Sequence, residues 1–334
     1  AAAVKADAYG LGMQEIVPAL RDAGCNEFFV ATLEEAITLR SITQDADIFV
    51  LNGVQEQQLD QFHNHHLIPV LSTFDSLDLW LQSGAIDSEA QPCALHIDTG
   101  MNRLGIPISK INEDQEQFLE KVSRLNLSLV MSHLACSEES EHPMNAQQLK
   151  LFNEIRGQFS NTPASLANTG GIFLGASYHH HMVRPGIGLY GGIVDNDTPY
   201  DLQHVVKLEA PVLQVKPVPR GSSVGYGGTW TAQKDSVIAT VALGYADGYS
   251  ISFSNKGSAV LHGTVVPVVG RISMDLLTLD VSELGSDNVS PGDVVTFAGD
   301  DLHVQDVASR GSMHSYQLLT SIGSRVLRDY IKAN

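Results

Sequence analysis

The amino-acid sequence predicts an α/β fold in which a (β/α)8 barrel of the TIM type is followed by a mostly antiparallel β domain. Apolar, β-branched runs alternate with amphipathic, helix-like stretches from the first residues to about residue 192. After about residue 205 the helical periodicity nearly disappears, and glycine and proline become more frequent. The chain has 334 residues, which is more than one ordinary domain. We therefore expect a barrel over residues 1–205 and a β domain over residues 206–334.

The barrel is predicted from short apolar runs separated by helix-like segments. Eight runs read as strands, at 1–7, 28–32, 47–53, 67–73, 94–100, 129–135, 163–168 and 180–191. The helix-like segments between them lie at 13–23, 33–40, 56–66, 74–83, 109–125 and 143–159. A count of eight favours a closed barrel over an open sheet. The link between the last two runs is short and rich in glycine, so the last unit departs from the pattern.

The second domain is predicted from short strands that follow one another with little helix between them. The strand candidates lie at 207–218, 236–244, 258–270 and 276–281, with one helical piece near 304–310. Turn-rich stretches such as 217–228 and 289–295 punctuate them. This order is typical of an antiparallel β domain.

Composition narrows the function classes. The net charge is −18 and no Lys/Arg run reverses it, which argues against a nucleic-acid partner. The cysteines Cys25, Cys93 and Cys136 are odd in number and far apart, as expected of reduced, cytoplasmic thiols that bind no metal. No apolar run reaches membrane-spanning length and no signal peptide is visible, so no membrane partner is expected. Residue 1 lies directly on the first strand, and we expect the N-terminus to be incomplete.

The first strand ends in a lysine with the properties of a nucleophile. Ala3, Val4 and Ala6 around Lys5 are small and apolar, and the glycines of a turn follow at 10 and 12. Burial among such residues lowers the pKa of a lysine and makes it reactive towards an aldehyde. A solvated surface charge is the alternative interpretation when the lysine is considered alone.

Eight motifs occur together in a fixed order along nearly the whole chain. They are VKADAYG at 4–10, HIDTGMNRLG at 96–105, MSHLA at 131–135, LANTGG at 166–171, VRPGIGLYG at 183–191, VGYGGTW at 224–230, VALGYADGY at 241–249 and GRISMD at 270–275. In these motifs the chain resembles the alanine racemases, fold-type III enzymes that use pyridoxal 5′-phosphate. The resemblance implies an isomerase with this same architecture of barrel and β domain.

The resemblance also implies how the cofactor is held. Lys5 would bind pyridoxal 5′-phosphate covalently, and Tyr9 would bond its phosphate. Thr169 and the backbone N–H groups of Gly186 and Ile187 would complete the phosphate cradle, since glycine lets the backbone approach an anion closely. A buried core tyrosine is the alternative for Tyr9.

Four further barrel residues are implied around the cofactor ring. Arg184 would face the pyridine nitrogen, and because arginine effectively never gives up its proton, that nitrogen should stay unprotonated. A neutral ring is a weaker electron sink, which limits side reactions such as transamination. Arg103 would donate to the phenolic oxygen of the cofactor and to the substrate carboxylate. His133 would lie beside the ring, and Asn168 would lie at the end of the seventh strand.

Racemisation requires a second acid–base opposite Lys5, and the resemblance implies Tyr245 for it. In the family the β domain completes the site of the neighbouring subunit, so the resemblance implies a homodimer with shared active sites. The backbone N–H of Met274 would meet the substrate carboxylate from the same partner. Met274 could equally be core packing, and Asp275 could be a structural partner of Arg271.

The chain departs from the family pattern at two positions. His96 stands where many members carry a lysine that becomes carbamylated and orients the arginine, so Arg103 must be held by His96, a chloride ion or water. Ser324 stands where some members carry a gate tyrosine, and this puts the contact to the cofactor phosphate and the width of the channel in doubt.

We expect a bacterial, cytoplasmic, pyridoxal-phosphate-dependent racemase that interconverts L- and D-alanine for peptidoglycan synthesis. A serine or broad-specificity racemase on the same scaffold is the nearest alternative. A related decarboxylase would need an acidic residue in place of Arg184. A non-catalytic pyridoxal-phosphate carrier would lack the β domain that contains Tyr245.

Overall fold

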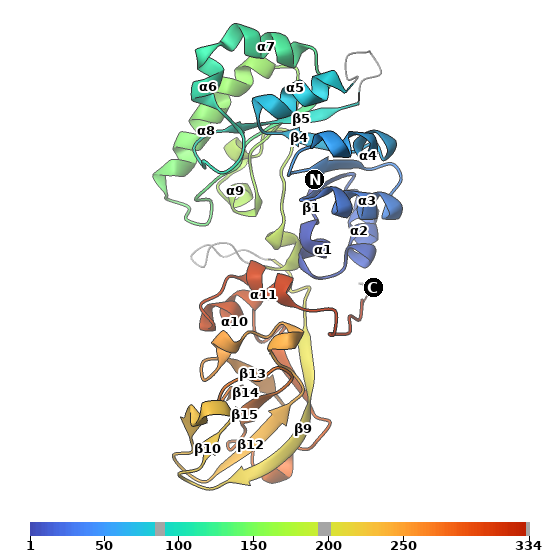
Figure 1. The fold of residues 1–334 in the computed structure, drawn as a ribbon. Helices are drawn as coiled ribbons and strands as arrows, with labels where there is room; N and C mark the ends of the chain where they lie inside the picture. Colours follow the sequence, from blue (N-terminus) through green and yellow to red (C-terminus); the bar gives the residue numbers. More distant parts are fainter. Residues whose placement is uncertain (84–90, 193–201, 332–334) are drawn as a thin grey trace. The chain divides into compact units, whose positions relative to one another are not determined.

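The computed structural model describes residues 1–83, 91–192 and 202–331 (Figure 1). These residues form two compact units. Among the described residues, one unit holds 1–8 and 12–189, and the other holds 9–11, 190–192 and 202–331. No helix within the described ranges is long and apolar enough to cross a lipid bilayer.

The first unit is built on a parallel sheet. Its strands lie in sheet order as β1 (Ala2–Ala3), β2 (Glu27–Val30), β3 (Asp47–Val50), β4 (Ile68–Leu71), β5 (Cys93–Asp98), β7 (Leu127–Met131) and β8 (Ala164–Ser165). Each neighbouring pair is parallel, and the runs are almost continuously apolar because both faces of the sheet are covered. The predicted α/β barrel class is confirmed. One short strand was not predicted, β6 (Ile106–Pro107), which pairs with β5.

The eighth strand is the exception. The strand predicted over 180–191 is reduced to a single parallel bridge between Ser165 and Met182. The barrel nevertheless closes, because the Ala3 N–H donates to the carbonyl of Pro185 at 2.9 Å. A longer strand is prevented because Pro185 has no N–H and Gly186 donates its own to a side chain, Thr169 Oγ1.

Helices cover the outside of this sheet (Figure 1). They are α2 (Met13–Asp22), α3 (Leu33–Ile42), α4 (Leu59–Asn64), α5 (Phe74–Gln82), α6 (Ile108–Glu113), α7 (Gln115–Ser123), α8 (Pro143–Arg156) and α9 (Thr169–Phe173). The helix predicted over 109–125 is divided in two at Asp114. This residue has φ −149° and caps α7, because its carboxylate accepts from Gln117 N–H at 3.1 Å.

The second unit is an antiparallel β unit. Its six-stranded sheet has the order β14 (Thr264–Pro267), β13 (Ser258–Leu261), β16 (Val294–Ala298), β9 (Leu208–Val218), β12 (Ser236–Val241) and β15 (Leu277–Asp280). A small hairpin joins β10 (Ser223–Val224) to β11 (Trp230–Thr231). Helix α10 (Val304–Arg310) lies where the sequence predicts a helical piece, and α11 (Ser315–Ser321) was not predicted. Tyr249, Phe253 and Phe297 are fully buried and pack ring against ring in the core.

Candidate active site

Lys5 follows β1 and is partly buried in the barrel unit. Burial is the largest cause that lowers its pKa, the positive charge of Arg103 lowers it further, and Glu35 acts in the opposite direction. Its ammonium forms no hydrogen bond or ion pair with the residues that the structure describes. The Val4 N–H before it donates to Phe29 O at 3.0 Å, and the Ala6 N–H after it donates to Glu35 Oε1 at 2.6 Å. The lysine is therefore anchored by its backbone while its amine stays available.

Directly after Lys5 the backbone adopts left-handed dihedral angles, which L-residues disfavour. Ala6, Asp7 and Ala8 have φ of 53°, 54° and 54°, so α1 (Lys5–Tyr9) is a short left-handed turn. A left-handed helical conformation costs an L-residue roughly 1–2 kcal/mol. Asp7 holds the turn, because its carboxylate accepts from Met13 N–H at 2.7 Å and its carbonyl from Gly12 N–H at 2.9 Å. Strain of this kind is concentrated at functional sites.

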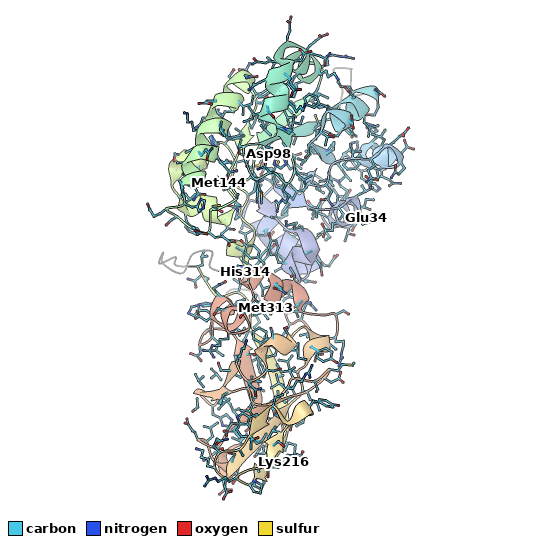
Figure 2. The ribbon with its side chains drawn as sticks, turned by 60° about the vertical axis from the view of Figure 1, so that its left-hand side comes forward. Glu34, Asp98, Met144, Lys216, Met313 and His314 are labelled. Atoms are coloured by element: carbon cyan, nitrogen blue, oxygen red, sulfur yellow. The ribbon has the colours of Figure 1, made fainter. Side chains whose placement is uncertain are left out.

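Arg103 lies in a turn that Asp98 organises. Asp98 ends β5 and is labelled in Figure 2; its Oδ1 accepts from Gly100 N–H at 2.8 Å and Asn102 N–H at 3.2 Å. Asn102 adopts φ 56°, a conformation that asparagine tolerates better than most residues. Arg103 itself is exposed and forms no hydrogen bond with the described residues, His96 included. Its positive charge nevertheless lowers the pKa of Lys5, so the two cations lie near each other.

Arg184 is buried, with 5% of its surface exposed. Nη1 donates to Ser165 Oγ, and Nη2 donates to Ser132 O at 2.7 Å and to Leu166 O at 3.4 Å. Nη2 also lies 3.3 Å from His133 Nδ1. Burial lowers the pKa of Arg184 to about 10, which still leaves the guanidinium charged at neutral pH. No hydrogen bond among the described residues involves Nε, so one donor of a rigidly held arginine remains available.

His133 and His96 are neutral neighbours of these cations. The pKa of His133 lies well below its usual value, mainly through burial and then through the charges of Arg184 and Arg103. Burial and the charge of Arg184 lower the pKa of His96 to about 4. Since the Arg184 guanidinium can only donate, Nδ1 of His133 accepts, and the ring proton belongs on Nε2. The positive charge of the site therefore belongs to Lys5 and the arginines, which suits an anionic ligand.

Thr169 gathers backbone donors from the segment after Arg184. Its Oγ1 accepts from Gly186 N–H at 3.0 Å and Gly188 N–H at 3.3 Å, so its own proton is left for another acceptor. A Cβ on Gly188 would lie 2.7 Å from Thr169 Cγ2, so only glycine allows this approach. Ile187, between the two glycines, is fully buried. Asn168 caps α9, its Oδ1 accepting from Gly171 N–H at 2.9 Å.

These groups fit pyridoxal 5′-phosphate. An unpaired lysine of lowered pKa suits its aldehyde, an uncommitted arginine Nε suits its ring nitrogen, and the Thr169 hydroxyl suits its phosphate. The tight approach at Gly188 makes the phosphate part of the site sensitive to added volume.

Tyr9 belongs to the second unit. Its ring packs against Tyr190 with centroids 4.8 Å apart and lies 6.1 Å from Tyr316. Burial raises the pKa of Tyr9 to about 12, so its hydroxyl is a neutral donor. That hydroxyl forms no hydrogen bond with the described residues. The interpretation of Tyr9 as a core residue therefore holds for its ring, and the phosphate contact of its hydroxyl stays a prediction.

Tyr245 lies on the turn that follows β12 in the second unit. Its N–H donates to Ser273 O at 3.1 Å, and the next N–H, of Ala246, donates to Met274 O at 3.0 Å. Gly244 lies so close to the Met274 carbonyl that no Cβ could fit. Tyr245 is 43% exposed and Met274 is 53% exposed, so the interpretation of Met274 as core packing is wrong.

A carboxylate pair and an arginine fasten this turn. Asp247 Oδ2 accepts from Gly244 N–H at 2.8 Å. Arg325 Nε lies 3.3 Å from Asp247 Oδ1, and its Nη1 lies 2.8 Å from Asp275 Oδ1. The alternative that Asp275 pairs with Arg271 is therefore wrong: the loop between them is not helical, so a spacing of four does not bring them together.

A depression of the second unit opens beside Tyr245. Its lining is Tyr245, Gly248, Ser250, Ile251, Met313, Gln317 and Ser321. Figure 2 labels Met313, which precedes α11. Ser324, the other residue predicted here, is exposed just beyond α11 and forms no hydrogen bond with the described residues.

Several residues of structural importance to the site were not predicted. Glu35 bonds the backbone beside Lys5 and also caps α3 with Thr32; the spacing Thr-x-x-Glu is a recognisable signal for this cap. Gln148, Asp247 and Arg325 were missed because their partners lie far away in the sequence, where no local pattern indicates a contact.

The chain is similar to known proteins over nearly its whole length. Residues 1–194 match the family model described as "Alanine racemase, N-terminal domain", and residues 205–330 match "Alanine racemase, C-terminal domain". An alanine racemase of Rhodospirillum rubrum is 44% identical over 99% of this chain and 88% of its own length. A catabolic alanine racemase of Agrobacterium fabrum is 40% identical over 99% of this chain and 86% of its own length. The crystal structure of the Bartonella henselae alanine racemase with covalently bound pyridoxal phosphate is 36% identical, with a TM-score of 0.92, over 99% of this chain and 92% of its own.

Proposed function

The chain belongs to the alanine racemase family of pyridoxal-phosphate-dependent isomerases, and from this premise we propose that it interconverts L- and D-alanine with two bases from two subunits. Lys5 serves one face of the substrate Cα, and Tyr245 of a second copy serves the other. The observation that carries the proposal is the state of Lys5: a partly buried amine, unpaired within the described residues, whose pKa is lowered by burial and by Arg103.

The proposed cofactor contacts divide between anchoring and tuning. Lys5 holds the cofactor, while the Thr169 hydroxyl and the Ile187 N–H bind its phosphate. The Gly186 N–H, predicted as a further phosphate donor, instead donates to Thr169 Oγ1 and supports that hydroxyl. When bound, pyridoxal 5′-phosphate supplies an electron sink that makes the Cα–H of an attached amino acid acidic. Arg184 donates through Nε to the ring nitrogen and keeps it unprotonated, because its two other nitrogens are already committed to Ser165, Ser132 and Leu166.

Both bases are needed because inversion at Cα takes a proton from one face and returns one to the opposite face. A neutral lysine amine can accept that proton, and the lowered pKa of Lys5 increases the neutral fraction. Tyr245 exchanges a proton at the other face through its hydroxyl. Arg103 and the Met274 N–H, which has no hydrogen-bond partner within the described residues, bind the substrate carboxylate.

The dimer is supported by the exposure of the second unit. Tyr245, Ile251, Met274 and Leu276 are all at least 39% exposed. Soluble monomers rarely leave grouped apolar side chains uncovered at a functional turn. A two-fold partner that covers this turn would bring Tyr245 into its own site, and each chain would complete the other.

We propose that the physiological product is D-alanine for peptidoglycan in a bacterial cytoplasm. A catabolic role is the second candidate, since one relative with 40% identity is named catabolic. A broad-specificity or serine racemase is a further alternative in substrate range. The test is to incubate the holoenzyme with L-alanine, L-serine and L-lysine and to follow each D-isomer. D-alanine should form fastest; equal or faster formation of D-serine would replace the substrate assignment.

A further inference from the structure

A buried glutamine connects three segments that meet around the cofactor-ring side of the barrel site. Gln148 lies on α8, one turn after Met144, which Figure 2 labels, and its side chain is fully buried. Its Oε1 accepts from Ala135 N–H at 2.9 Å. Its Nε2 donates to His133 O at 2.9 Å and to Thr99 Oγ1 at 3.3 Å. A buried amide is costly to leave unsatisfied, so its three bonds to Thr99 and to the segment 133–135 fix these two segments against α8.

The segment that Gln148 fixes is the one that holds Arg184. Thr99 Oγ1 lies 2.7 Å from Ser132 Oγ, and both side chains are buried. Ser132 O and His133 Nδ1 are two of the acceptors that face Arg184 Nη2. The glutamine thus touches neither cofactor nor substrate, yet it determines where two acceptors of the guanidinium lie.

We propose that Gln148 is the positioning residue for Arg184. Through Thr99 and the backbone of residues 133–135 it keeps Ser132 O and His133 Nδ1 in place, and the guanidinium then keeps Nε directed to the cofactor ring. The inference rests on the proposed function in one respect, the control of the ring nitrogen by Arg184. Loss of Gln148 should therefore loosen that control without weakening the phosphate contacts at Thr169.

The chain offers closely matched variants. Gln148→Met keeps the length and volume of the side chain and removes all three hydrogen bonds. Thr99→Val keeps the shape and removes the hydroxyl, while Thr99→Ser keeps the hydroxyl. Asn145→Leu is the control: Asn145 is also buried on α8, but it donates to Cys136 O at 3.1 Å and Glu139 O at 2.9 Å, outside this network.

The measurement is the partition of the holoenzyme between racemisation and half-transamination, in which the amino group of alanine passes to the cofactor and pyruvate is released. Gln148→Met should raise the pyruvate to D-alanine ratio about tenfold, the equivalent of one lost buried hydrogen bond. Thr99→Val should raise it less, and Thr99→Ser should restore it. The dissociation constant of pyridoxal 5′-phosphate should stay within about twofold, since the phosphate is bound elsewhere.

Asn145→Leu should lower the melting temperature as Gln148→Met does and leave the ratio unchanged. A wild-type ratio in both Gln148→Met and Thr99→Val overturns the inference, because the glutamine is then structural only. If Gln148→Met does not fold, Thr99→Val and its serine counterpart decide the matter. Arg184→Glu is measured alongside: a changed ratio there with none in the Gln148 and Thr99 variants rejects this inference alone. An unchanged ratio in Arg184→Glu rejects both it and the proposed task of Arg184.

Discussion

The two units present their candidate residues in opposite ways. In the barrel unit, Lys5, His133 and Arg184 are withdrawn from water, and burial is the largest cause of the shift in each of their pKa values. In the β unit, Tyr245 and Met274 lie on an exposed turn, with 43% and 53% of their surfaces accessible. The barrel therefore sets its electrostatics within one chain, whereas the β unit offers an exposed turn that the proposed partner subunit would cover.

The two units therefore control charge and orientation by different means. Burial keeps His133 neutral. Arg184 stays charged in the same environment because its guanidinium donates to Ser165, Ser132 and Leu166. Tyr245, the proposed proton donor at the opposite face, is oriented instead by backbone bonds of its turn to Ser273 O and Met274 O and by the ion pairs of Arg325 with Asp247 and Asp275. Substitutions in either unit should therefore have different consequences.

The largest effect is expected for Lys5→Ala. Racemisation should fall to background, because the barrel unit loses both the cofactor attachment and one base. Borohydride reduction should attach the cofactor irreversibly to the wild-type protein and not to the variant, as followed by intact mass and visible absorbance. Lys110→Ala, at an exposed lysine on α6, is the control. A full yield of reduced adduct in Lys5→Ala would remove Lys5 from the mechanism.

Arg184→Glu should change the chemistry more than the rate of binding. A carboxylate that faces the ring nitrogen favours its protonation, so transamination should rise relative to racemisation, on the order of a hundredfold. The pyruvate and D-alanine formed by holoenzyme are measured together. Simple loss of the cofactor, or wild-type behaviour, would contradict the electronic role.

The buried histidine of the barrel predicts a dependence of stability on pH. The pKa of His96 is about 4 when folded and 6.5 in an ordinary environment, so the unfolded chain binds more protons between these values. The contribution of His96 to the free energy of unfolding is therefore lost as pH falls through 6.5 towards 4. It should be about 2 kcal/mol smaller near pH ~5 than near pH ~8.

Urea unfolding at these two pH values checks this contribution. His96→Asn should remove it from the difference between the two pH values. His66→Asn, at an exposed histidine with φ 48° that asparagine accommodates, should leave the difference as in wild type. Equal pH differences in wild type and His96→Asn would show that His96 is not held neutral by the fold.

The smallest effect is expected for Arg325 of the β unit, which forms ion pairs with both Asp247 and Asp275. Arg325 is 51% exposed, and exposed ion pairs contribute little to stability, so Arg325→Ala should leave the melting temperature nearly unchanged. Racemisation should nevertheless fall by roughly fivefold, because the Tyr245 turn loses its link from Asp247 to Asp275. Exchange of the Cα proton at the face of Lys5, followed in deuterated water, should not change. An equal fall of exchange and racemisation would assign the effect to the barrel instead.

The sequence was sufficient for the order of the two folds along the chain, and it located candidate site residues in short motifs, whose roles stay predictions. The alternation of runs predicts the parallel barrel, and Lys5, Arg103 and Arg184 lie in motifs whose order is specific. What it could not predict depends on long-range contacts. The left-handed turn after Lys5 contains alanines, which have no preference for positive φ, so it is imposed by bonds from Asp7 and Glu35.

Long-range contacts also explain the remaining differences between the sequence predictions and the structure. The pairing of Asp275 joins two loops that are far apart in the chain, and proximity in sequence pointed instead to Arg271. The predicted strand over 180–191 is shortened because Pro185 has no N–H and because the Gly186 N–H donates to Thr169 Oγ1. Only the fold brings Gly186 and Thr169 together. The apolar pattern predicts where a helix such as α8 lies. It does not predict that Gln148, on the buried face of that helix, hydrogen-bonds to the backbone of residues 133–135.

Complementation between two inactive variants tests most directly whether each active site is shared between two subunits. Lys5→Ala and Tyr245→Phe should each fail to racemise alone, although Tyr245→Phe should still bind pyridoxal 5′-phosphate. After random subunit exchange about half of the dimers are mixed, and each mixed dimer has one site with both lesions and one with neither. Activity should recover to roughly a quarter of wild type. If both bases belonged to one chain, every site would carry one lesion. No recovery, with exchange verified by native mass spectrometry, would contradict the shared site.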